Sequence, residues 1–145
     1  QNVDIVDTLV KHGVNVNHPT NIKMFPTYFV CCQEDWLEED DIANILLPLL
    51  SILLNGRSNL NSKGLDDSTV LHFASAKLNH IVCEFLVKSG ADTEMRDYLQ
   101  RSPLHMALRN PNIRVTETLI KLEQILRQNI SMATHRWLTL VSMEI

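Results

Sequence analysis

The chain has 145 residues, 45% of them hydrophobic and 21% charged, which is the composition of a folded globular domain with its own core. The formal net charge of −4 argues against a nucleic-acid partner, since such surfaces usually carry a basic face. The longest apolar run, residues 42–54, is shorter than the roughly twenty apolar residues that cross a membrane. We therefore expect no membrane span within this segment.

The first predicted element is a helix that ends before Gly13, and its pattern occurs three times along the chain. Residues 5–17 read IVDTLVKHGVNVN, and residues 82–92 read VCEFLVKSGAD. A weaker form, LLNGRSNLN, occupies residues 53–61. The two clear copies have apolar residues at helical spacing and then a glycine, at which a helix can end in a left-handed cap.

A second pattern alternates with the first and is typical of a helix start. Its copies are FPTYFV at residues 25–30, TVLHFA at residues 69–74 and SPLHMA at residues 102–107. Thr69 and Ser102 can accept a hydrogen bond from an unpaired N–H of the first helical turn. Proline suits that turn because no donor is needed there, and Tyr28 occupies the histidine position of the first copy.

The two patterns keep one register. Val70 and Pro103 are 33 positions apart. Pro26 and Val70 are 44 positions apart, and so are the end markers Asn17 and Asn61. The start marker and the end marker thus both exceed the spacing of 33 by the same 11 residues. The second unit is therefore predicted to carry one insertion between its two ends.

These segments resemble the ankyrin repeat, which has a period of 33 residues and the helix-start motif T-P-L-H-x-A. The resemblance covers residues 1–122. It implies an all-α fold, an ankyrin-repeat solenoid of helix pairs with short hairpin fingers. It also implies that His72 and His105 hydrogen-bond backbone groups of the adjoining turns, and that the concave face and the finger tips bind another protein.

In this register we expect one domain fragment. Its parts are a partial repeat (1–19), a repeat with the 11-residue acidic insertion (20–63), a repeat (64–96), a repeat with an extended second helix (97–128), and a C-terminal tail or cap (129–145). Gln1 falls just before a second helix, so we expect the first helix of that repeat to lie upstream. The last helix is predicted to continue to about Gln128 and to end at Asn129 or Ser131.

No catalytic, metal or cofactor site is predicted. The histidines outside the repeated motif show no ligand spacing with Cys, Asp or Glu, and no phosphate loop occurs. We therefore expect no enzyme, cofactor, metal or small-molecule substrate. The three cysteines, Cys31, Cys32 and Cys83, are odd in number and two are adjacent, which indicates reduced thiols and an intracellular location, cytoplasmic or nuclear.

Two surfaces are candidates for partner binding. In the family, variable outward positions lie at the finger tips and at the ends of the first helices, here Ile22, Met24, Leu65, Asp66, Lys77, Tyr98, Leu99, Arg101, Arg109 and Asn110. The alternative is that each finger covers the tip of its neighbour. The second surface is an acidic docking loop for a basic partner, formed by Glu34, Asp35, Trp36, Glu38, Glu39, Asp40 and Asp41, although such charge runs are usually solvated loops.

The expected function is that of a protein–protein interaction module, a scaffold within a larger intracellular adaptor or regulator. The alternative is a passive structural segment within a larger enzyme or channel.

Overall fold

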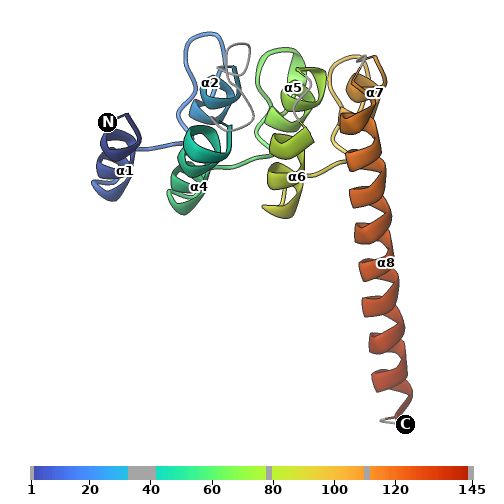
Figure 1. The fold of residues 1–145 in the computed structure, drawn as a ribbon. Helices are drawn as coiled ribbons and strands as arrows, with labels where there is room; N and C mark the ends of the chain where they lie inside the picture. The colour runs from blue at the N-terminus through green and yellow to red at the C-terminus, as the bar shows by residue number, and fades with distance from the viewer. Residues whose placement is uncertain (1, 33–41, 78–79, 110–111, 144–145) are drawn as a thin grey trace.

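The computed structural model describes residues 2–32, 42–77, 80–109 and 112–143 (Figure 1). Its elements, in chain order, are α1 (Asn2–Lys11), α2 (Pro26–Cys32), the π-helical segment η2 (Ile42–Leu46), α4 (Leu47–Asn55), the 3-10 turn η3 (Leu65–Asp67), α5 (Val70–Ala76), α6 (His80–Lys88), α7 (Pro103–Leu108) and α8 (Ile113–Met143). No strand occurs within these described ranges. The predicted all-α architecture is therefore confirmed.

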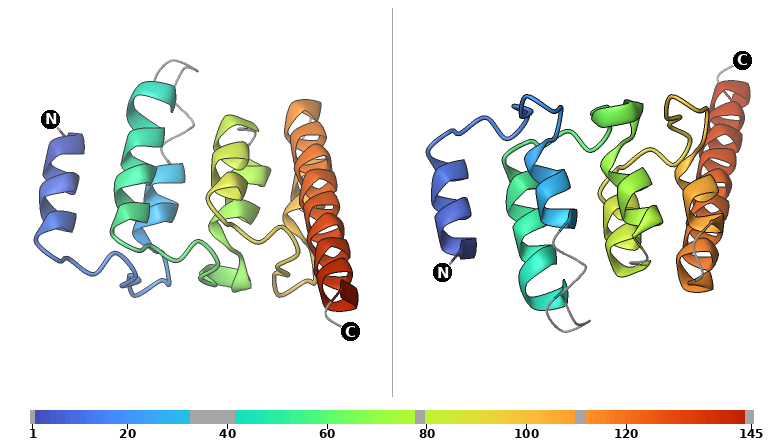
Figure 2. Two further views of the ribbon diagram at one scale, coloured as in Figure 1. Left: turned by 90° about the horizontal axis from the view of Figure 1, so that it is seen from below. Right: turned by 90° about the horizontal axis from the view of Figure 1, so that it is seen from above.

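The helices form two layers (Figures 1 and 2). Helices α2, α5 and α7 make one row, and α1, α4, α6 and α8 make the other. Each pair packs within itself and against the next pair, as α5 does against both α6 and α7. The core lies between the rows and includes Leu50, Leu71, Leu86 and Leu119, all of them completely buried. Each unit thus buries a face that it could not bury alone.

Local hydrogen bonds start α5 and α7. The predicted cap is present before α7, where the Ser102 Oγ accepts the His105 N–H (3.4 Å). The Thr69 N–H donates to His72 Nδ1 (3.2 Å) before α5, and the Ser102 N–H donates to His105 Nδ1 (3.2 Å) before α7. Because these bonds are made within one turn, the motif alone is enough to place both helix starts.

The same histidine position also connects neighbouring units. His72 Nε2–H donates to the Arg101 carbonyl oxygen (2.9 Å), which confirms the predicted role of His72. One unit earlier, the Tyr28 hydroxyl donates to the carbonyl oxygen of Ser68, the residue that corresponds to Arg101. Tyr28 therefore replaces histidine in both register and contact.

Left-handed residues follow α1, α4 and α6. Gly13 (φ 82°) follows α1 and Gly90 (φ 99°) follows α6, both at the predicted cap positions. After α4 the corresponding residue is Arg57, with φ 62°, and not the neighbouring Gly56. The cap is therefore retained there with a residue that carries a Cβ.

The predicted end of the last helix is wrong. Helix α8 continues through Asn129 and Ser131 to Met143, well beyond the other helices of its row (Figure 1). No Gly or Pro occurs between Ile113 and Met143, and Asn or Ser costs a helix only a few tenths of a kcal/mol relative to the best formers. Residues 129–136 are exposed, so this part of the expected tail or cap extends away from the stack.

Candidate functional site

Three fingers connect the helix pairs, and we number them finger one (residues 20–24), finger two (64–68) and finger three (97–101). The first N–H of each finger donates to the carbonyl oxygen of its last residue, over 2.9, 2.9 and 3.1 Å respectively. In each finger the residue before the last has a positive φ, namely Lys23 (56°), Asp67 (54°) and Gln100 (60°). The fingers are thus tight turns of one kind, although finger two has a second positive φ at Asp66 (56°), and Figure 2 shows them along one edge of the stack.

Neighbouring fingers contact each other closely. The Tyr98 N–H donates to the Asp66 carbonyl oxygen (3.0 Å), which joins finger three to finger two. Between fingers two and one, a Cβ added to Gly64 would lie 3.0 Å from both the Lys23 carbonyl oxygen and the Tyr28 ring. Gly64 is therefore needed for close approach, and the fingers form a continuous surface held by backbone contacts.

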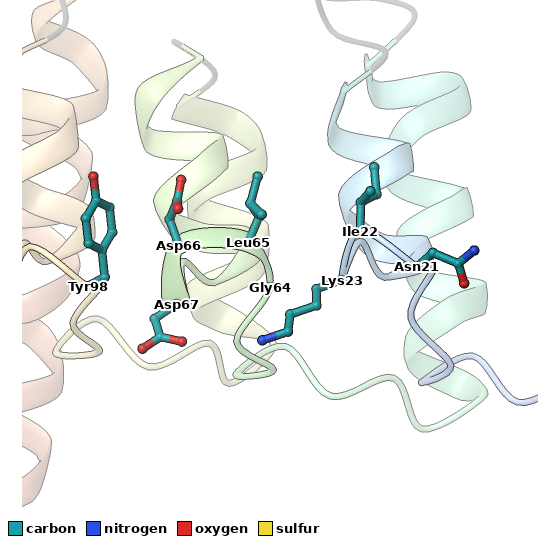
Figure 3. A pocket seen from close by; sticks show the side chains of 8 residues that line it. All are labelled: Asn21, Ile22, Lys23, Gly64, Leu65, Asp66, Asp67 and Tyr98. Atoms are coloured by element: carbon teal, nitrogen blue, oxygen red, sulfur yellow. The ribbon is translucent and has the colours of Figure 1, made fainter.

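A groove of about 570 Å³ crosses this surface (Figure 3). Its lining comes from all three fingers: Asn21, Ile22, Lys23, Gly64, Leu65, Asp66, Asp67 and Tyr98. The apolar members Ile22, Leu65 and Tyr98 remain 59%, 60% and 57% exposed. The neighbouring fingers therefore do not cover these tips, contrary to the alternative that the sequence left open.

The groove also carries charge. Asp67 Oδ2 lies 3.8 Å from Nζ of Lys63, the residue directly before finger two. The Asp66 carboxylate has no hydrogen-bond or ion-pair partner within the described part of the chain. The lining thus contains one positively charged side chain, Lys23, and two carboxylates, those of Asp66 and Asp67.

Arg101 and Asp97 form a structural ion pair inside finger three. Arg101 Nε and Nη2 lie 2.8 and 2.7 Å from Asp97 Oδ2, and Asp97 Oδ1 accepts the backbone N–H groups of Leu99 and Arg101. Burial alone would raise the pKa of Asp97, but the hydrogen bonds from Arg101 hold it below its usual value. Arg101, a predicted contact residue, is thus also part of the turn's own structure.

The remaining predicted contact residues lie outside the groove. Met24 is half-buried against the core, and Leu99 is exposed. Lys77 directly follows α5, with its Nζ 5.8 Å from the centroid of the Phe73 ring, and Arg109 directly follows α7 and is exposed. Asn110 and the acidic docking loop, Glu34, Asp35, Trp36, Glu38, Glu39, Asp40 and Asp41, lie outside the described residues.

Sequence reasoning missed Lys23, Gly64 and Asp67 as groove residues. Lys23 and Asp67 could have been found, because they follow Ile22 and Asp66 and share one register position with Gln100. No sequence signal identifies Gly64, since its role is a contact with the preceding unit.

Paired helices in two rows, joined by equivalent fingers, define a helical repeat solenoid. The family model for ankyrin repeats (three copies) matches residues 42–130, more than half of the chain. The chain therefore belongs to the ankyrin-repeat family, whose members are generally protein–protein interaction modules and typically non-catalytic. A comparison with curated proteins finds no match.

The described residues also show what the stack lacks. They contain no group of three or more His, Cys, Asp or Glu side chains placed to hold a metal ion. Among the helices of the described ranges, none is both long and apolar enough to span a membrane.

Proposed function

We propose that this chain binds a partner protein through the three-finger groove and the adjoining concave face, as part of a larger intracellular adaptor or regulator. The supporting observation is the row of Ile22, Leu65 and Tyr98, which stay more than half exposed although a soluble fold gains nothing from exposing them together. Tyrosine is also a residue type that interfaces favour.

The rigidity of the groove supports the same proposal. Backbone contacts connect finger two to both of its neighbours, through the bond from Tyr98 to Asp66 and the close approach at Gly64. A surface that is ordered before binding loses little conformational entropy when a partner docks, so more of the contact energy appears as affinity. The chain is proposed to act in a reducing compartment, because Cys31 and Cys83 are buried in the core as thiols and form no disulfide.

The proposal can be tested with ligands selected from a library of random-sequence peptides displayed on phage. Peptides that bind the wild-type chain are then measured against the double variant Leu65→Ala with Tyr98→Ala. We expect affinity to fall by about 30-fold, equivalent to roughly 2 kcal/mol, because both apolar contacts are lost. Thermal melting checks that the variant remains folded.

The matched control is Ile113→Ala with Ile120→Ala, which removes two exposed apolar side chains of α8 away from the groove. This control is expected to bind like the wild type. If the selected peptides bind both double variants equally well, or if no peptide is selected, the groove is not a recognition site and a passive structural role is favoured.

A further inference from the structure

The geometry of the groove points to the chemistry of its ligand, and we propose that it takes an extended peptide segment with one Lys or Arg side chain between two apolar side chains. This inference rests on the proposed function. It starts from the order of the side chains in Figure 3, in which Tyr98, Asp66, Leu65 and Ile22 form a row and point to the same side. The Asp66 carboxylate lies within this row, between Tyr98 and Leu65.

The unpaired carboxylate selects for a cation. An apolar segment laid across the whole row would remove Asp66 from water without giving it a partner, which is strongly unfavourable for a charged group. An acidic segment would be repelled. A Lys or Arg side chain instead forms a charge-assisted hydrogen bond with the carboxylate and can also lie against the face of the Tyr98 ring.

The other charges of the lining do not neutralise this position. Lys23 extends in Figure 3 away from the row that contains Ile22 and Asp66. Asp67 adds a second carboxylate to the lining, and its Oδ2 lies 3.8 Å from Lys63 Nζ. The row therefore presents a carboxylate flanked by apolar groups, and the complementary ligand is a cation flanked by apolar groups.

The repeat sets the spacing of the ligand. Packed helices lie roughly 8–10 Å apart, and successive fingers follow the helix pairs that they connect. An extended chain advances about 3.3 Å per residue, so about three residues of the ligand cover the distance from one finger to the next. A basic residue at Asp66 of finger two then places an apolar residue about three positions away over Ile22 of finger one. Toward finger three the step is shorter, because the Tyr98 N–H donates to the Asp66 carbonyl oxygen (3.0 Å), so the second apolar residue lies nearer to the basic one.

The test uses the peptides that are selected on the wild-type chain and that depend on Leu65 and Tyr98. These are expected to share a Lys or Arg with one apolar residue about three positions away on one side and a second apolar residue nearer to it on the other side. Affinity for them should fall at least about tenfold in Asp66→Asn, which keeps the shape of the side chain but removes its charge. The control Glu117→Gln removes an exposed carboxylate of α8 and should leave affinity unchanged.

A double-mutant cycle isolates the contact itself. The basic residue of one selected peptide is replaced by Gln, and both peptides are measured against the wild type and Asp66→Asn. Coupled losses, which weaken as the salt concentration rises, show that the two charges meet. Additive losses, or groove-dependent peptides without a basic residue, overturn this inference and leave the proposed function standing. Absence of any groove-dependent peptide overturns both.

Discussion

The left-handed cap after α4 offers a direct test of how this stack is stabilised. Arg57 has φ 62° at the position that Gly90, with φ 99°, occupies after α6. We expect Arg57→Gly to stabilise the chain and Gly90→Ala to destabilise it. The two variants make the same exchange in opposite directions at equivalent sites.

The magnitude follows from the backbone alone. A residue with a Cβ in the left-handed region costs roughly 1–2 kcal/mol, whereas glycine adds about 0.4–1 kcal/mol of unfolded-chain entropy that must be lost. The net expectation is therefore about 0.5–1 kcal/mol at each site. Side-chain packing should contribute little, because a Cβ on Gly90 would meet no atom within 4 Å and Arg57 is exposed. The bonds of Arg57 to Leu54 and Asn17 are made by its backbone and survive the change.

Equilibrium urea denaturation measures the free energies of unfolding. The control is Gly56→Ala, in which φ is an ordinary −73° but the new Cβ would lie 2.8 Å from Val10 Cγ1 of α1. This variant should be destabilised by a steric clash and not by backbone strain. If Arg57→Gly leaves the unfolding free energy unchanged or lowers it, the assignment of cap strain at Arg57 is refuted.

Other expectations concern the finger, the histidine and the last helix. Arg101→Ala should cost about 2–3 kcal/mol, since it leaves the carboxylate of Asp97 buried without its partner; a loss under about 0.5 kcal/mol in urea denaturation would contradict the structural role. Burial lowers the pKa of His72, so the stability that depends on its neutral ring is present above about pH 6.5 and is lost as the pH falls below that value. Melting curves across this range should show the loss in the wild type and not in His72→Gln; the same profile in both would contradict the role of His72. Ser131→Pro should reduce the helical circular-dichroism signal with little change in the melting midpoint. Leu119→Ala, in the buried core, should lower the free energy of unfolding by about 2–4 kcal/mol. Equal losses of melting midpoint in these two variants would mean that the end of α8 packs on the stack.

The starts of α5 and α7 and the ends of α1 and α6 could be predicted from the sequence, because they depend on interactions within one turn. The bonds from Thr69 to His72 and from Ser102 to His105 span three residues, and each motif contains both partners. Gly13 and Gly90 mark helix ends because few other residues tolerate a positive φ. The 33-residue register then ordered these local units into a stack.

The predicted end of α8 failed because local signals were weak there. Asn129 and Ser131 disfavour a helix only slightly, and a helix that is already nucleated and anchored by buried residues such as Leu119 propagates through them. Sequence reasoning also treated Arg101 as an outward contact, because nothing in the pattern shows that Asp97 is buried beneath it.

The sequence by itself thus determined the repeat, its caps and the set of outward positions. Only the tertiary structure decided which of those positions lie together. Ile22, Leu65 and Tyr98 are far apart in the chain, and they become one surface because Gly64 lets two fingers approach and the Tyr98 N–H bonds to Asp66. Contacts between units depend on distances that no single motif contains, so a groove shared by three fingers has no signature in any one of them.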